Sequence, residues 1–154
     1  MKKIVLISCT KKKKDCRCAA WELYSASELF KKELVYAREL TTDKYIYVLS
    51  AKHGLIQLTD ELDPYNQTLN GAKKSVVVDW SHGVFRQMQG AGLLDCSELV
   101  FLAGNNYRKH LIPLIMNVAP KVKISVPAEG LRIGQQLKFF KNQTVHTSGK
   151  GNCV

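Results

Sequence analysis

The sequence lacks any apolar run of about 18 residues, the length that a transmembrane helix needs. Its one apolar stretch near the start, Ile4 to Cys9, is too short for the core of a signal peptide. Acidic residues are also scarce: 13 Asp and Glu stand against 23 Lys and Arg, which gives a net charge of +10. These features predict a cytoplasmic protein that does not enter the membrane and that binds an anionic partner.

Metal and dinucleotide signatures are missing as well. The spacing of Cys9, Cys16 and Cys18 is C-x6-C-x-C, which matches no standard zinc or iron–sulfur pattern. No Walker A motif is present, and Gly130 and Gly134 form only part of a G-x-G-x-x-G pattern. We therefore predict neither a metal nor a cofactor. The odd number of cysteines, five, favours reduced thiols over a disulfide framework.

Apolar β-branched runs alternate with amphipathic segments, which predicts a three-layer α/β/α sandwich around a mostly parallel sheet of about four strands. The expected strands are residues 4–8, 45–50, 99–103 and 122–126. The expected helices are residues 19–24, 27–40, 73–90 and 133–141, with a further one that starts at 105 and that Pro113 would kink or shorten. Residues 51–70 are too apolar for disorder and are expected to form an ordered irregular loop. Residues 1–145 would make one domain and residues 146–154 a peripheral tail.

In parallel sheets, ligands bind beyond the carboxyl ends of the strands, so the residues that follow each expected strand are the first site candidates. They are small or polar at each of the four junctions. We expect substrate contacts from Ser8, Cys9, Thr10, Lys11, Ser50, Gly54, Tyr65, Gly104, Tyr107 and Gly130.

Four residues among these loops have the chemistry of catalysis. Lys52 suits a phosphate or carboxylate, and His53 can move protons near neutral pH. Asp63 and Glu129 are the carboxylates that would act as a base or grip a sugar hydroxyl. The alternative is a structural one, in which Lys52 and His53 are ordinary surface residues and Tyr65 only anchors its loop. The lysine run at 11–14 would then serve solubility, and Cys9 would be an inert buried thiol instead of a lysine-activated nucleophile.

Several motifs resemble an uncharacterised bacterial and phage domain family, over roughly residues 4–141. They are ISCTKKK at 7–13, LSAKHGLI at 49–56, DPY at 63–65, LAG at 102–104 and EGL at 129–131. A more distant likeness links Gly54-Leu55 and Pro64-Tyr65 to the peroxide-stress YaaA family, which is associated with DNA binding. The opening and the stretch from Ser50 to Gly54 are similar to the uracil-DNA-glycosylase-like domain of archaeosine tRNA synthases, although the water-activating glycosylase motif is absent. Both likenesses imply nucleobase or nucleic-acid chemistry.

Taken together, these features predict an enzyme that acts on a nucleotide, a nucleoside or a base within nucleic acid, by cleaving or exchanging an N-glycosidic bond. Ser8, Cys9 and the first lysines would hold phosphate, Lys52 and His53 would face the base or sugar, and Tyr65 or Tyr107 would stack on the base. Two alternatives stay open: a DNA- or RNA-binding module without activity, and a phage-type protein that sequesters a nucleotide signal.

Overall fold

A mixed five-stranded sheet forms the centre of the protein, for which the computed structural model describes residues 2–132 and 134–142. The strand order is β4-β3-β1-β6-β7, in which β4 is antiparallel to β3 and the other neighbours are parallel. The strands are β1 (Lys3–Ser8), β3 (Ile46–Ser50), β4 (Gly54–Gln57), β6 (Glu98–Leu102) and β7 (Lys123–Ser125). A separate antiparallel ribbon joins β2 (Cys18–Ala19) and β5 (Glu61–Leu62).

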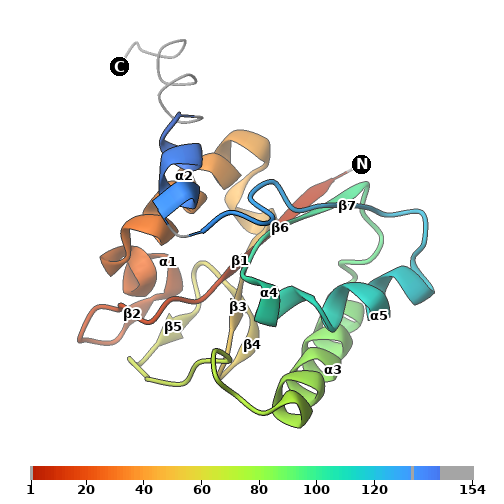
Figure 1. The fold of residues 1–154 in the computed structure, drawn as a ribbon, viewed down its shortest axis with the longest axis horizontal. Coiled ribbons are helices and arrows are strands. Elements are labelled where there is room, and N and C mark those ends of the chain that lie inside the picture. Colours follow the sequence, from red (N-terminus) through yellow and green to blue (C-terminus); the bar gives the residue numbers. More distant parts are fainter. Residues whose placement is uncertain (1, 133, 143–154) are drawn as a thin grey trace.

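Helices cover both faces of the sheet, as the pattern predicted (Figure 1). The α-helices are α1 (Ala20–Leu23), α2 (Glu28–Leu40), α3 (Lys74–Gly90), α4 (Asn105–Arg108) and α5 (Leu111–Val118), with 3-10 turns at η1 (Tyr24–Ala26) and η2 (Asp43–Tyr45). Residues 134–142 are also helical. This last segment lies beside α2, where the Tyr36 ring packs edge-on against Phe139 and Phe140, while α3, α4 and α5 lie on the opposite face (Figure 1).

The local sequence explains these elements. Four consecutive apolar residues of β1, Ile4 to Ile7, are completely buried, because helices cover both sides of this central strand. Ser27 caps α2, since its Oγ accepts a hydrogen bond from the backbone N–H of Phe30 at 3.2 Å. Pro113 is the third residue of α5, in the first turn, where its missing N–H leaves no helical hydrogen bond unmade. The helix expected from residue 105 is instead divided before Pro113, at Lys109 and His110, between α4 and α5.

The stretch after β3 differs from the irregular loop that we predicted. Its first part turns back at once to form β4, and a later part forms β5. The tight return depends on Gly54, whose φ of +74° is a conformation that other residues adopt only with strain. Leu58, Leu62 and Leu69 are buried, so the segment does pack against the body of the protein.

Two predictions reach beyond the described part of the chain. The expected tail at residues 146–154 and the domain boundary at 145 lie outside it. Within residues 2–132 and 134–142, no helix has the length and apolar character needed to cross a membrane.

Candidate functional site

Three loops meet at the carboxyl edge of the sheet, where the chain changes direction. From β1 the chain crosses to β3 on one side, and from β4 it returns to β6 on the other side of β1. This reversal opens a crevice between the ends of β1 and β6, the usual ligand position in such sheets. The Ser8 Oγ accepts a hydrogen bond from the Gly104 N–H at 3.4 Å, so two predicted site residues meet there.

Ser50 organises the turn that follows β3. Its side chain is completely buried, and its Oγ accepts hydrogen bonds from the N–H groups of Lys52 and His53 at 3.2 and 3.0 Å. The Ser50 carbonyl accepts a hydrogen bond from the Trp80 indole at 2.9 Å. The turn that carries Lys52 and His53 is thus fixed by a serine and by α3.

A chain of hydroxyl groups runs inward from this turn. The Ser50 Oγ lies 2.7 Å from the Tyr65 hydroxyl, which lies 2.5 Å from the Tyr24 hydroxyl. Burial raises the pKa of Tyr24 to about 12 and raises the pKa of Tyr65 still further. Both phenols are therefore neutral at physiological pH and act as hydrogen-bonding groups.

Cationic and imidazole side chains surround the Tyr65 ring. The Lys13 Nζ lies 4.4 Å from the ring centroid and the Lys52 Nζ 5.9 Å from it, while the His53 ring packs edge-on at 5.6 Å. Burial, and then the charge of Lys52, lowers the pKa of His53, so this imidazole is neutral at pH 7. Burial also lowers the pKa of Lys13. These are the contacts of the Tyr65 ring in the free protein, and its role in base stacking stays a prediction.

Beside this cluster lies a cavity of about 360 Å³, which we call the crevice pocket. It is lined by Cys9, Thr10, Lys11, Asn66, Gln67, Thr68, Asn70 and Tyr107. Tyr107 is buried edge-on against Trp80, and its hydroxyl accepts hydrogen bonds from the Leu69 N–H at 3.2 Å and the Cys9 thiol at 3.5 Å. The pocket thus combines a lysine, three amides and several hydroxyls, which suits a polar anionic ligand.

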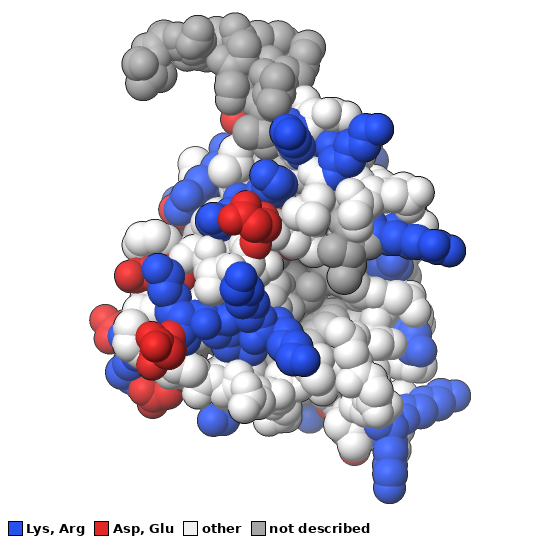
Figure 2. Space-filling model, turned by 60° about the vertical axis from the view of Figure 1, so that its left-hand side comes forward, with Lys and Arg blue, Asp and Glu red and all other residues white. Residues whose placement is uncertain are grey.

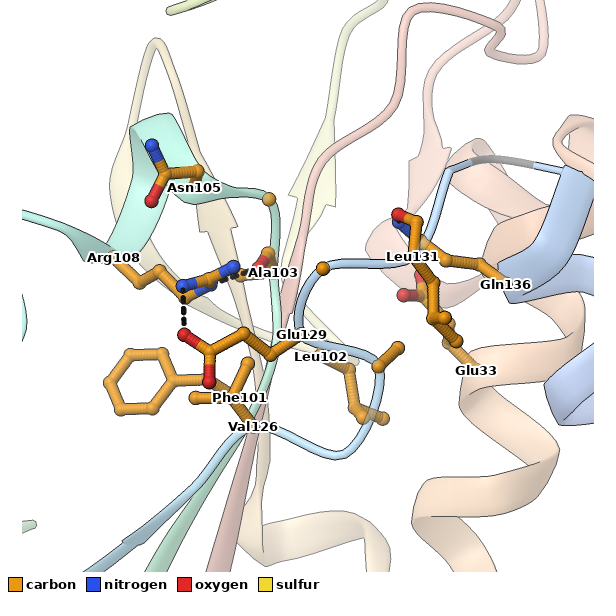
Figure 3. Close-up of a pocket in the computed structure, with 13 residues that line it drawn as sticks. Glu33, Phe101, Leu102, Ala103, Asn105, Arg108, Val126, Glu129, Leu131 and Gln136 are labelled. Atoms are coloured by element: carbon orange, nitrogen blue, oxygen red, sulfur yellow. Dashed lines mark hydrogen bonds and ion pairs between the residues drawn. The ribbon is translucent and has the colours of Figure 1, made fainter.

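A second cavity, of about 440 Å³, lies at the ends of β6 and β7, and we call it the β6–β7 pocket. Three of the predicted residues line it, namely Gly104, Glu129 and Gly130. Figure 3 shows Glu129 on one side of this cavity, beside Arg108. Arg108 donates from Nε to the Ala103 carbonyl at 3.1 Å and pairs with Glu129 at 3.6 Å.

Most of the predicted residues lie at the carboxyl edge of the sheet, but they do not share one cavity. Cys9, Thr10, Lys11 and Tyr107 share the crevice pocket, and Ser50, Lys52, His53 and Tyr65 form the adjoining cluster. Asp63 is exposed on the β2–β5 ribbon, where Arg17 holds it in an ion pair at 3.0 Å. The two predicted carboxylates, Asp63 and Glu129, therefore do not line the crevice pocket.

Sequence reasoning missed several residues of these sites. The amides at Asn66, Gln67 and Asn70 follow no strand, so the rule about strand ends did not select them. Glu33 lines the β6–β7 pocket and is only 4% exposed. A signal for Glu33 does exist, because it lies three residues after Phe30 and beside Leu34, on the apolar stripe of α2.

Lysines also gather near this edge. Figure 2 shows Lys and Arg side chains close together on the face that carries the β1–β2 loop, with acidic side chains at the margin. Lys11 to Lys14 belong to that loop, and Arg17 at its end is neutralised by Glu61 and Asp63 at 3.9 and 3.0 Å. Because Arg17 is paired, the positive charge that this loop places beside the crevice pocket comes from its lysines.

Comparison with known proteins identifies a family for the chain. The model of a family of unknown function, DUF6884, matches residues 4–142. Neither the curated proteins nor the solved structures include a match to the chain.

Proposed function

The chain belongs to the DUF6884 family, whose function is unknown, and we propose that it is an enzyme that binds a nucleotide, free or within nucleic acid, and cleaves or exchanges the N-glycosidic bond to its base. The observation that carries this proposal is the crevice pocket at the β1–β6 reversal. Lys11 and three amides line it, and Lys13 and Lys52 lie beside it on Tyr65.

The lining matches the parts of a nucleotide. Lysines attract phosphate as point charges, and backbone N–H groups of a loop can add hydrogen bonds to it. Amide side chains offer a donor and an acceptor side by side, which is the pattern on the edges of nucleobases. The sequence likeness to the YaaA family and to the archaeosine synthase domain supports a nucleobase as the target, and it is part of this proposal.

The chemistry that we propose depends on His53. A neutral imidazole can take the proton of a water molecule as that water attacks the sugar C1′. The C1′–N bond breaks, its electron pair leaves with the base, and the Lys52 ammonium beside His53 donates a hydrogen bond to the departing nitrogen. Because Asp63 and Glu129 are held by Arg17 and Arg108, we assign the proton transfer to His53 instead of either carboxylate.

The same ion pairs favour a second candidate, a nucleic-acid-binding module without activity. An enzyme of this type usually has a free carboxylate beside the sugar, and both predicted carboxylates are neutralised by arginine. Such a module would bind single-stranded nucleic acid through the same lysines with affinity that falls steeply with salt. It would release no base.

The test is an assay of base release. The protein is incubated with nucleosides, nucleotides and single-stranded, duplex and damaged DNA, and free base is measured by chromatography. We expect release by the wild type, a loss of roughly 100-fold or more in His53→Gln, and no loss in His82→Gln on α3. Failure to release base from any substrate would overturn the enzymatic proposal, and salt-dependent binding in that case would favour the module.

A further inference from the structure

The β6–β7 pocket contains a buried acid that the proposed function does not use. Glu33 comes from α2, reaches the cavity from its helical wall and is only 4% exposed. Burial alone raises the pKa of its carboxyl well above the ordinary value, and no charge or hydrogen bond from the described residues offsets that burial. Glu33 is therefore a buried carboxyl group that faces an open cavity with no hydrogen-bond or ion-pair partner among the described residues.

A neutral carboxylic acid presents one O–H donor and one carbonyl acceptor side by side. Its natural complement is an N–H group next to a carbonyl oxygen or a ring nitrogen, the arrangement found in cyclic amides and amidines. Two hydrogen bonds then form at once, and the buried acid gains the partners that it lacks in the free protein.

The rest of the pocket fits a flat heterocycle. Phe101, Leu102 and Val126 provide apolar walls, and the volume of about 440 Å³ is within the range of small-molecule sites. Across the cavity from Glu33, Arg108 and Glu129 form the opposite polar side (Figure 3). Gln136 lies near Glu33, where its Nε2 donates to the Leu131 carbonyl at 2.8 Å.

The charges argue against an ionic ligand. Arg108 already pairs with Glu129, so an anion would meet no free cation among the described lining residues and would face two carboxyl groups. A cation would require Glu33 to ionise in a largely buried position, which is unfavourable. The ligand that fits this pocket is therefore neutral and forms paired hydrogen bonds.

We propose that the β6–β7 pocket binds a neutral heterocycle of the cyclic amide or amidine class, held by paired hydrogen bonds to the Glu33 carboxyl. This inference does not rest on the nucleotide site at the crevice pocket, because the two cavities share no lining residue. Either proposal can fail while the other stands.

Calorimetric titration of the full chain with adenine, cytosine and uracil tests the proposal, with benzamidine as the cationic probe. We expect at least one neutral heterocycle to bind at one site per chain. Glu33→Gln keeps one donor and one acceptor and should bind within about threefold of the wild type, whereas Glu33→Leu should bind roughly tenfold to 100-fold more weakly. Glu39→Leu on the exposed side of α2 is the matched control and should change nothing.

Ala128→Leu narrows the cavity and leaves Glu33 in place. It should also weaken binding, and it tests the pocket independently if the Glu33 variants do not fold. Heats measured at pH 7 in buffers of different ionisation enthalpy should agree, because a neutral ligand leaves Glu33 protonated. The proposal is overturned if none of the three heterocycles binds at millimolar concentration. It is equally overturned if benzamidine alone binds, with proton release and with loss of binding in Glu33→Gln.

Discussion

A carboxyl group buried without a partner destabilises the fold at neutral pH, and Glu33 is in that position. Because burial raises its pKa, the folded state binds the proton more tightly than the unfolded state does. The contribution of Glu33 to stability is therefore fully present below the ordinary pKa of 4.5 and is lost as the pH rises above it, up to the raised value.

Glu33→Leu should consequently raise the free energy of unfolding at pH 7 by about 1–3 kcal/mol. The gain should shrink toward pH 4, where the carboxyl is mostly protonated in the unfolded state as well as in the folded state. Urea denaturation at the two pH values measures the difference, with Glu39→Leu as a surface control expected to stay within about 0.5 kcal/mol. A Glu33→Leu protein that is less stable at pH 7 would show that the carboxyl has a stabilising partner.

A second prediction at the scale of residues concerns His53. Its pKa lies below 6.5 because of burial and, to a smaller extent, because of the positive charge of Lys52. Lys52→Met should raise this pKa toward 6.5 without reaching it, since burial remains. Lys44→Met, at the amino edge of the sheet before β3, should leave it unchanged. NMR titration of the imidazole measures the His53 pKa in both variants. An unchanged pKa in Lys52→Met would show that the Lys52 charge does not act on His53.

The tight turn between β3 and β4 is the element on which the cluster around Tyr65 depends. Gly54 has φ +74°, and a Cβ there would lie 2.2 Å from the Gln87 Oε1. That amide oxygen accepts the Leu55 N–H at 2.9 Å, so it cannot move without leaving a donor unpaired. Gly71 has a similar φ of +82° with open space around it.

Gly54→Ala should therefore cost more stability than Gly71→Ala. We expect about 1–2 kcal/mol for the left-handed backbone in both variants, with at least about 1 kcal/mol more in Gly54→Ala for the lost hydrogen bond. Thermal or urea unfolding of the two variants provides the comparison. Equal losses of stability in the two variants would mean that the Gln87 side chain moves away without cost and does not stabilise the turn.

Strands β1 and β3 before this turn were predicted from the sequence, and the short strands β4 and β5 after it were not. The buried strands β1, β3 and β6 were predictable, because covering both faces of a parallel sheet demands runs of apolar β-branched residues. β4 and β5 were not, since four-residue and two-residue strands carry too little alternation to separate them from loop. Ser50 and Gly54 were selected as site residues for their place after a strand, and the structure adds their role in fixing the turn.

At the scale of the whole molecule, the predicted convergence at the carboxyl edge follows from topology. Ser8 meets Gly104 because the parallel strands β1 and β6 end at one edge, and the turn between β3 and β4 places Lys52 and His53 beside Tyr65. The sequence alone could not predict which of these residues line the crevice pocket and which line the β6–β7 pocket. Nor could it show that Asp63 pairs with Arg17, 46 residues away in the chain, outside both pockets.

The positive charge of the molecule leads to a prediction about salt. If Lys11, Lys13 and Lys52 contact phosphates, replacing all three with Gln should reduce the slope of log affinity against log salt for single-stranded DNA by roughly 2. The triple variant Lys2, Lys44 and Lys121→Gln removes the same charge from near the amino ends of β1, β3 and β7 and should change the slope far less. Fluorescence anisotropy at several salt concentrations measures both slopes, and equal changes would indicate diffuse attraction without a site.

We propose that the carboxyl ends of β1, β3 and β6 form a nucleotide site, and NMR mapping of the backbone amides during titration with AMP would locate it. We expect saturable shifts concentrated in residues 9–13, 50–54, 66–70 and 104–107, with the amides at the amino edge of the sheet unchanged. Shifts concentrated elsewhere, or no saturable shift at millimolar AMP, would contradict it.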